Sequence, residues 1–413
     1  MATETTDRIP RFVVLAILGT ALLSFCGILT ETSMNVTFPT LMAQFHVQID
    51  TVQWLTTGYL LVAALVMTMA SFIHKRFTYR AAFATAVLLF LVGLLMCALA
   101  PTFSILLVGR LIGGIATGLS TPLMFSIITD FIPHAKLGQS MAIGGTIIGL
   151  APTLGPTYGG LVSYYLGWRT IFWIILPIAL AAFCIGYFNI QQRHATSKAH
   201  FDSVGFLLIA AAFVTISLGF NDASIHGWAS GLFIGLTVVG AVALGLYAVW
   251  ASHTAQPLIN VTIFKNPMFV LSFLTYMILQ LSNIGLGFLL PNYAQLVIGA
   301  NVMTAGLLLL PGSLLRTVLM PFAGGLLDRR GARLPILTGL TCLVVAILGF
   351  VVMGSRLSVG WVLGIYIVYS VGFSLTFSNT LTNGIRLLLV MGTRRLTRFN
   401  SMQGPSGRPS WQR

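Results

Sequence analysis

The sequence GGLLDRRGAR, residues 324–333, lies between two long apolar runs and carries four charged side chains. Glycines allow two helix ends to approach closely, and Asp328 is of a residue type that caps helices. The flanking runs, about 303–327 and 334–353, have near the ~20 residues that a helix needs to cross the hydrocarbon core of a bilayer. The stretch therefore predicts a tight charged turn between two membrane-spanning helices.

The composition of the whole chain indicates a membrane protein. Of its 413 residues, 57% are hydrophobic and 7% are charged, with 22 Lys and Arg against 8 Asp and Glu. An ordinary soluble domain has about 25% charged residues. So few charges cannot cover the surface of a soluble protein of this length. A soluble enzyme, a secreted disulfide scaffold and a disordered tail protein are excluded, and a polytopic helical membrane protein remains.

Twelve apolar segments have the length of a transmembrane helix. Their apolar runs are continuous and do not alternate with polar residues, which excludes the strands of a β-barrel. We therefore predict an all-α polytopic membrane protein without an inserted soluble domain. The predicted segments are 12–36, 52–73, 81–100, 103–128, 139–162, 169–190, 203–220, 228–251, 268–290, 303–327, 334–353 and 358–381.

The distribution of basic residues predicts the orientation in the membrane. With the N-terminus inside, 18 of the 22 Lys and Arg lie on the cytoplasmic side, Arg169 and Arg356 lie outside, and Arg110 and Arg316 fall within helices. Cytoplasmic loops of membrane proteins carry such an excess. Both termini are therefore predicted to be cytoplasmic in a plasma-membrane protein. The net charge of +14 does not indicate nucleic-acid binding, because the basic residues are spread between segments of a lipid-embedded chain.

The turn at 324–333 resembles the G-x-x-x-D-R-x-G-x-R loop of the major facilitator superfamily. That family repeats the loop in each half of the molecule. The stretch SFIHKRFTYR (71–80) is a degenerate first copy, which keeps Arg76 and Arg80 but has Lys75 in place of the acid. The resemblance implies the major facilitator fold. The residues that it assigns to the second copy of the loop are Gly324, Asp328, Arg329, Gly331 and Arg333.

The spacing of the two loop copies predicts the branch of the family. Arg76 and Arg329 are 253 residues and eight predicted helices apart, two helices more than in a twelve-helix member. That spacing resembles the fourteen-helix drug:proton antiporters. Further stretches that resemble landmarks of this branch are NVTFP (35–39), QWLTTGYLL (53–61), LLVGRLIGG (106–114), APTLGPTYGG (151–160) and GWRTIFWIILP (167–177).

The resemblance also implies a division of the chain. Residues 1–195 are the expected six-helix N-terminal half, 196–256 two extra central helices, and 257–385 the four helices of an incomplete C-terminal half. Residues 386–413 are expected to be a basic tail without regular structure. That tail either attracts anionic lipid or marks a truncated or frame-shifted product. Truncation is the favoured expectation, because two of the fourteen helices are missing.

Charged residues inside predicted helices are candidates for the coupling site, because burying such a charge costs at least ~2.5 kcal/mol. Glu31 is the only acidic residue inside a predicted segment, and a proton carrier must exist both protonated and ionised. The family places its acid at the position of Thr30, about 100° away around the helix. The alternative to a proton carrier is that Glu31 lies in water at the end of its helix. Arg110 resembles the fourth-helix arginine to which the family assigns assistance in proton transfer, whereas Arg316 has no recognised counterpart.

The fifth predicted helix is rich in glycine and proline, which remove side-chain bulk and backbone donors. By resemblance to the antiporter signature, this helix is a pivot for alternating access, and a merely packed helix is the alternative. Its signature residues are Gly149, Pro152, Gly155, Pro156, Gly159 and Gly160. The polar residues that could line a substrate cavity are Asn35, Gln53, Gln280, Asn283, Asn292, Gln295 and Arg316.

No pattern for catalysis or cofactor binding occurs in the sequence. A Gly-rich phosphate loop is missing, so ATP-driven export is not predicted, and the His and Cys residues lack metal-ligand spacing. We predict a monomeric transporter, not an enzyme, that needs no cofactor or metal. It exports small amphipathic or cationic drugs in exchange for protons. The alternatives are export of an endogenous metabolite or lipid-like compound, and an inactive membrane fragment.

Overall fold

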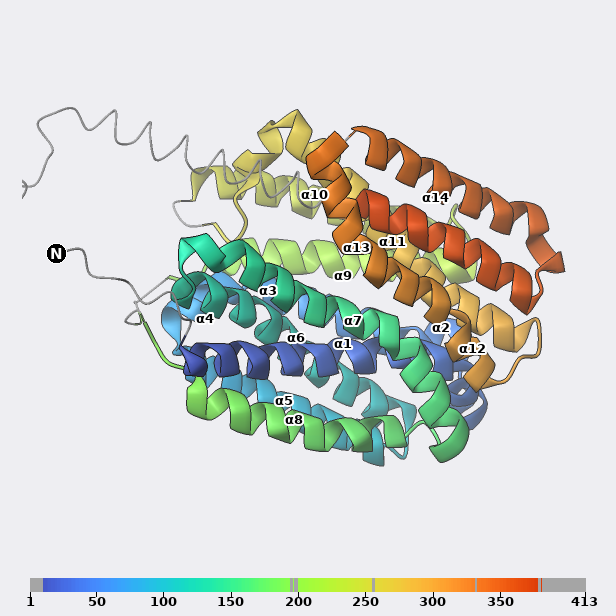
Figure 1. Ribbon diagram of the computed structural model, residues 1–413, viewed down its shortest axis with the longest axis horizontal. Helices are drawn as coiled ribbons and strands as arrows, with labels where there is room; N and C mark the ends of the chain where they lie inside the picture. Colours follow the sequence, from blue (N-terminus) through green and yellow to red (C-terminus); the bar gives the residue numbers. More distant parts are fainter. Residues whose placement is uncertain are drawn as a thin grey trace, which may run out of the picture. The chain divides into compact units, whose positions relative to one another are not determined.

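The computed structural model describes residues 10–193, 196, 200–254, 257–330, 333–377 and 380. For 134, 135, 138, 139, 142, 321, 324–330, 333 and 355 it describes the backbone alone. The described residues form helices and contain no strand (Figure 1). The predicted all-α class is therefore confirmed. Contacts divide the chain into two units, which are described separately below.

The first unit comprises Met1–Asn260, Leu286–Ser313 and Ser358–Leu363. It also contains the C-terminal part of α11 (Pro267–Leu296). Its other helices are α1 (Arg11–Phe45), α2 (Ile49–Val52), α3 (Trp54–Thr68), α4 (Ala70–Arg76), α5 (Tyr79–Leu99), α6 (Phe103–Phe131), α7 (His134–Leu166), α8 (Thr170–Asn189), α9 (Ser203–His226), α10 (Gly231–His253) and α12 (Val302–Leu308).

The second unit comprises Val261–Gly285, Leu314–Leu357 and Gly364–Arg413. It contains the N-terminal part of α11. Its other elements are η1 (Val261–Lys265), most of α13 (Leu310–Arg330), α14 (Arg333–Met353), η2 (Gly354–Arg356) and most of a last helix, Val359–Phe377.

Short polar residues begin several of these helices. Thr78 before α5, Asp202 before α9 and Asn301 before α12 each accept a hydrogen bond from the backbone N–H three residues later, at 3.2, 2.9 and 2.7 Å. Each bond satisfies a donor that has no partner within its own helix. With these caps, the three helices begin within two residues of the starts of the predicted apolar segments.

The central helix of the first unit is α1, which packs against α6, α7 and α8. The adjacent α5 packs against α6 and α8, and α12 packs against α7. Large side chains that are buried between these helices include Leu23, Phe38, Phe83, Phe90 and Phe172. α1 therefore carries side chains that are surrounded by protein on most sides, which is where a buried charge can be held.

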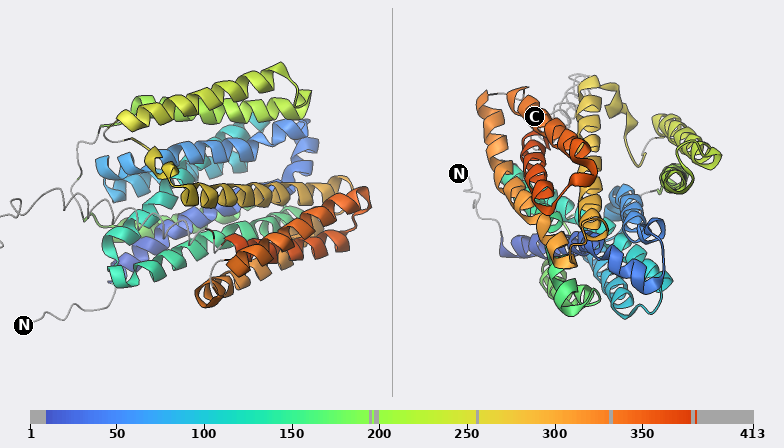
Figure 2. Two further views of the ribbon diagram at one scale, coloured as in Figure 1. Left: turned by 90° about the horizontal axis from the view of Figure 1, so that it is seen from above. Right: turned by 90° about the vertical axis from the view of Figure 1, so that its right-hand side faces the viewer.

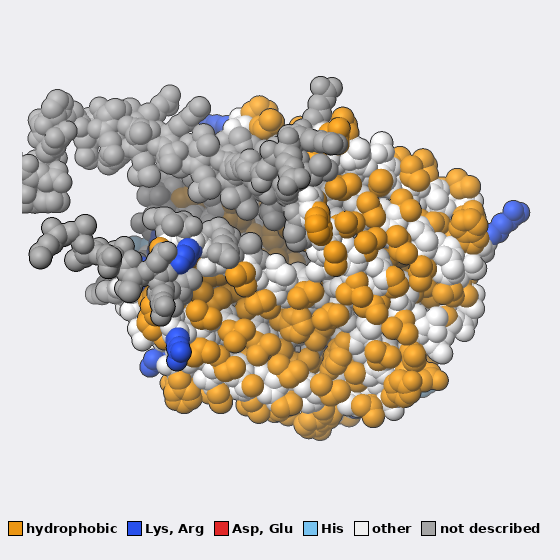
Figure 3. Space-filling model, viewed as in Figure 1, with side chains coloured by type: hydrophobic (Ala, Val, Ile, Leu, Met, Phe, Trp, Pro, Cys, Tyr) orange, Lys and Arg blue, Asp and Glu red, His pale blue; other side chains and the backbone are white. Residues whose placement is uncertain are grey.

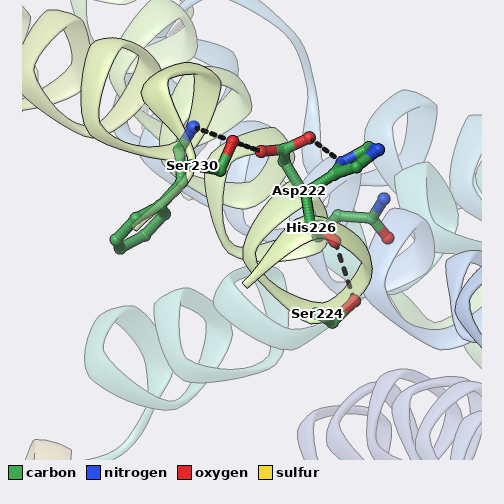
Figure 4. Close-up of polar contacts among 6 residues, drawn as sticks. Asp222, Ser224, His226 and Ser230 are labelled. Atoms are coloured by element: carbon green, nitrogen blue, oxygen red, sulfur yellow. Dashed lines mark hydrogen bonds and ion pairs between the residues drawn. The ribbon is translucent and has the colours of Figure 1, made fainter. Parts of the chain in front are cut away.

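α9 and α10 form an antiparallel pair and lie side by side along their length (Figure 2). Asp222 joins the end of α9 to the start of α10 (Figure 4). Its buried carboxylate accepts a hydrogen bond of 2.5 Å from Ser230 Oγ and lies 2.7 Å from Nδ1 of His226. Because these groups satisfy one another at the turn, we assign Asp222 a structural role in the pair.

Eleven helical segments among the described residues are long and apolar enough to cross a membrane. They coincide with eleven of the twelve predicted segments, and the remaining one, 139–162, lies inside α7. On the face drawn in Figure 3 the described side chains are mostly hydrophobic, and Lys and Arg lie at its edges. A soluble protein does not expose so much apolar surface. The exposed residues Leu246, Val249, Leu337, Val351 and Val352 therefore face lipid in this protein.

The end of α1 differs from the prediction. The helix continues past the predicted end at residue 36, through Pro39, to Phe45. A proline removes one intrahelical hydrogen bond but does not end a helix that neighbouring helices hold in place. The consequence is that Glu31 lies near the middle of α1, not at a solvated helix end.

Candidate functional site

Two opposite charges are buried in the first unit. Glu31 in α1 is 7% exposed, and Arg110 in α6 is 3% exposed. Arg110 is the cation whose charge acts on Glu31. Arg110 lies in the second turn of α6, where the sequence predicts it. The packing of α1 against α6 therefore places the two residues that were predicted to couple protons near enough for their charges to interact.

The surroundings of Arg110 leave part of the guanidinium without a partner. Its Nε donates to the carbonyl of Leu55 at 3.3 Å, and its Cζ lies 4.2 Å from the centre of the Tyr59 ring. The NH2 nitrogen is buried and has no hydrogen-bond partner among the described residues. A buried charge with an unused donor lowers the stability of the folded protein, so its presence indicates a role other than folding. Interaction with a negative charge that is bound or released nearby is such a role.

Tyr59 in α3 belongs to the same cluster but is not one of the predicted site residues. Its hydroxyl donates to the carbonyl of Gly27 at 2.9 Å and lies 2.5 Å from Thr117 Oγ1. Gly27 and Glu31 are one turn apart on α1 and share a face. No signal in the stretch QWLTTGYLL marks Tyr59, because a tyrosine there is ordinary. The site therefore comprises residues of α1, α3 and α6.

Thr30, the position at which the family has its acid, is also buried. Its hydroxyl donates to the carbonyls of Cys26 and Gly27 in its own helix, at 3.0 and 2.8 Å. The hydroxyl of Thr30 therefore has its hydrogen-bond partners within α1. Among the described residues of α1, Glu31 has the only carboxyl group.

The glycines of α7 differ in what they contact. A Cβ on Gly155 would collide with Thr32 of α1, and one on Gly159 would collide with the backbone of Ser33. A Cβ on Gly160 would lie 2.7 Å from the carbonyl oxygen of Val302 in α12. A Cβ on Gly149 would meet nothing within 4 Å. Three of the four glycines therefore permit close packing, and Pro152 and Pro156 lie within the same continuous helix.

Three of the predicted cavity residues form a cluster in the first unit. Asn292 Nδ2 donates to the carbonyl of Asn35 at 3.1 Å, and Gln295 Nε2 donates to that of Val36 at 2.8 Å. Asn35 Oδ1 accepts from Thr56 at 2.9 Å. Asn292 Oδ1 is buried without a partner among the described residues. The C-terminal part of α11 is therefore hydrogen-bonded to the middle of α1, close in sequence to Glu31.

The other predicted cavity residues lie elsewhere. Gln53 is a half-buried residue between α2 and α3. In the second unit, Arg316 donates to Asn283 Oδ1, and Gln280 forms a hydrogen bond with Tyr276 one turn earlier on α11. The predicted cavity residues therefore form separate clusters in the two units.

The first copy of the loop motif lies at the ends of α4 and α5. Arg76 is exposed at the last position of α4. Arg80 donates to the carbonyl of Ile190 at 3.1 Å, and its Cζ lies 5.5 Å from the centre of the Tyr187 ring. Arg80 therefore fastens the start of α5 to the end of α8.

The second copy of the loop motif lies largely outside the described residues. This applies to the side chains of Asp328, Arg329 and Arg333 and to Gly331 as a whole, and of Gly324 only the helical backbone is described. The helix α13 ends at Arg330 and α14 begins at Arg333. The boundary between the two helices therefore lies within the predicted turn.

The helix α4 of the first unit contains a half-buried histidine, His74, outside the membrane-spanning segments. Its Nδ1 lies 2.8 Å from Ser126 Oγ. Burial lowers the pKa of His74 from 6.5 to about 4, although the nearby Asp130 carboxylate opposes this shift. The folded protein therefore holds this imidazole neutral down to lower pH than the unfolded chain does.

We expect His74 to make the folded state less stable in acid. Because its folded-state pKa lies below the unfolded value, its contribution is complete above pH 6.5 and is lost as the pH falls from 6.5 to about 4. After allowance for partial solvent access, the loss is of the order of 1–2 kcal/mol. Thermal unfolding of wild type and His74→Gln at pH 7 and pH 4.5 checks this. The difference in melting temperature between the two pH values should be smaller in the variant, and an equal difference would contradict the prediction.

With this geometry established, the comparisons with known proteins identify the family. The family model described as Major Facilitator Superfamily matches residues 20–398. The chain belongs to the Major Facilitator Superfamily and is a multi-pass membrane protein of the transporter kind, not an enzyme. This confirms the predicted fold.

The curated relatives of the chain include proteins named for drug resistance. The lincomycin resistance protein LmrB of Listeria innocua is 34% identical over 365 residues, covering 88% of this chain and 77% of the relative. LmrB of Bacillus subtilis is 33% identical over 395 residues, covering 94% and 82%. Among solved structures, the xylose transporter XylE from E. coli matches with a TM-score of 0.62 at 13% identity, covering 91% of this chain and 88% of XylE. That structural likeness shows the fold alone.

Proposed function

We propose that this chain exports small amphipathic or cationic toxic compounds from the cell in exchange for protons, by alternating access. The observation that carries the proposal is the buried pair Glu31 and Arg110, on adjacent helices of the first unit. Ionisable residues inside a membrane are costly, and they mark ion or substrate pathways. The names of the LmrB relatives support drugs as the class of compound.

The proposed mechanism follows from the chemistry of this pair. When Glu31 is ionised, Arg110 and Glu31 neutralise each other's charge. When Glu31 binds a proton, its charge no longer offsets that of Arg110, whose unused donor is then left to bind water or another acceptor. The protonation state of one buried carboxyl group therefore changes the net charge that is buried between α1 and α6. Such a change is a means of coupling a proton to a shift between conformations.

We further propose that the chain belongs to the fourteen-helix drug:proton antiporter branch, as a monomer in the plasma membrane. The α9–α10 pair supports this proposal, because it lies in the sequence between the two loop copies. Asp222 closes the pair with its own hydrogen bonds. Two helices whose polar groups form hydrogen bonds with each other can be inserted between the two halves of a transporter without changing the contacts within either half.

Expression in a bacterial host that lacks its own efflux pumps tests the function. We expect protection against some members of a panel of amphipathic and cationic compounds, with loss of protection when the proton gradient is collapsed. The same host with an empty vector is the control. Protection that survives collapse of the gradient would exclude proton coupling. Absence of protection against every compound would contradict drug export.

A further inference from the structure

The second unit contains a buried cation deep within a membrane-spanning region. Arg316 is 6% exposed. It is equally far in sequence from Val302, where α12 begins, and from Arg330, where α13 ends. The helical rise of α13 places it about 21 Å from Arg330. A charge at this depth costs at least ~2.5 kcal/mol unless it is paired or lines a wet cavity.

The partners that the structure gives Arg316 are neutral. A terminal nitrogen donates to Asn283 Oδ1, and Cζ lies 4.9 Å from the centre of the Phe373 ring. The backbone carbonyl of Arg316 accepts from Ser374 Oγ at 3.0 Å. An amide oxygen and an aromatic face stabilise a guanidinium, but neither carries the negative charge that would neutralise it.

The sequence supplies no acid at this depth. After Asp222, the only acidic residue in the whole chain is Asp328. Arg316 and Asp328 are twelve positions apart on α13, which corresponds to about 18 Å of helix. The backbone separation alone exceeds the reach of an ion pair. The buried Arg110 of the first unit lies near enough to the buried acid Glu31 for their charges to interact, whereas the buried Arg316 of the second unit has no counterpart to that acid.

Hydroxyl groups lie on the helices that contact Arg316. Ser370 Oγ is buried and has no hydrogen-bond partner among the described residues. Ser370 and Ser374 are one turn apart, so they share a helix face. Ser282 and Tyr369 are linked through their hydroxyls at 2.8 Å. A cation, an unused hydroxyl and an aromatic ring are the groups that bind the head and the body of an amphipathic anion.

We propose that Arg316 binds the oxyanion of an amphipathic organic acid or zwitterion, as a carboxylate, phosphate or sulfonate, with Phe373 against its apolar part. A guanidinium presents a planar fork of donors that matches such a group. The depth of Arg316 favours a free compound over a lipid headgroup, because headgroups lie near the ends of a spanning helix. That this compound is a transported substrate rests on the proposed export function, whereas the binding itself does not.

Two probes of equal shape and opposite charge test the proposal. Radiolabelled 1-naphthoate and 1-naphthylmethylammonium are bound at equilibrium to the full chain in phosphatidylcholine nanodiscs, without any ion gradient. We expect naphthoate to bind at least about tenfold more tightly, the difference that one charge-assisted hydrogen bond supplies. Arg316→Gln should abolish the preference, and Arg316→Lys should retain part of it. Arg356→Gln, at an exposed arginine, is the matched control and should change nothing.

The variant Asn283→Asp keeps the test decisive if Arg316→Gln does not fold. It replaces the amide oxygen that contacts Arg316 with a carboxylate of the same size. We expect a melting temperature at or above that of wild type, and loss of naphthoate binding, because the cation is now neutralised internally. Equal affinity of wild type for both probes, or naphthoate binding by a folded Asn283→Asp variant as in wild type, would overturn the proposal.

Nanodiscs of phosphatidylglycerol distinguish the two sources of an oxyanion. Unchanged naphthoate affinity in that lipid supports a free compound as the occupant. Competitive loss of naphthoate, confined to proteins that retain Arg316, overturns the free compound and assigns the site to the headgroup. Because no gradient is applied, failure of either arm leaves proton-coupled export to be judged by the drug-protection experiment.

Discussion

Replacing Glu31 with glutamine is expected to abolish proton-coupled export while the protein remains inserted in the membrane. Glutamine has nearly the same size and polarity, so the packing around α1 is preserved, but its amide cannot bind and release a proton. Removing a group that transfers a proton typically costs at least about 100-fold in rate. The measurement is compound uptake by everted vesicles under an imposed pH gradient, normalised to the amount of protein in the membrane.

Two variants make the result specific to a buried titratable group. Glu31→Asp keeps the carboxyl group but shortens it, and should retain part of the transport. Asp50→Asn removes an acid of α2, outside the Glu31 cluster, and should transport like wild type. Undiminished gradient-driven uptake by Glu31→Gln would remove Glu31 from the mechanism. Equal losses in Glu31→Gln and Asp50→Asn would indicate a general effect of lost charge.

The membrane-spanning helices could be predicted from the sequence because each is a long continuous apolar run. The end of α1 could not be placed in the same way. A proline at position 39 and polar residues such as Asn35 favour an early end, yet neighbouring helices hold α1 in helical form to Phe45. Tertiary packing decided the outcome against the local preference. That difference matters for function, because it moves Glu31 from a helix end to the helix middle.

The charged residues of the candidate site could be predicted, but their contacts with other helices could not. Glu31 and Arg110 stand out because charges are rare in apolar runs. Tyr59 does not, because a tyrosine in such a run is ordinary until the packing of α3 on α6 places it under Arg110. Likewise, nothing local indicates that Asn292 contacts the carbonyl of Asn35, 257 positions away. Such contacts depend on which helix faces meet, and a single sequence does not contain that information.

Adding a methyl group at Gly159 is expected to destabilise the first unit strongly, whereas the same change at Gly149 is not. A Cβ at position 159 would lie 2.9 Å from the Cα and 3.0 Å from the carbonyl carbon of Ser33. Both atoms are backbone, so no side-chain rotation relieves the collision, and α1 and α7 must separate. Overpacking of this kind costs about 1–3 kcal/mol. A Cβ at position 149 meets nothing, and alanine favours a helix by up to about 1 kcal/mol over glycine.

The same pair of variants separates the two interpretations of α7, a packed helix and a pivot. Thermal unfolding should show Gly159→Ala less stable than wild type and Gly149→Ala as stable or more so. If α7 only packs, Gly149→Ala should transport normally. If α7 bends during transport, Gly149→Ala should slow uptake without lowering stability, because Gly149, where an added Cβ would meet nothing, gives α7 its freedom to bend. An equal loss of stability in both variants would show that close contact with α1 is not what requires glycine at position 159.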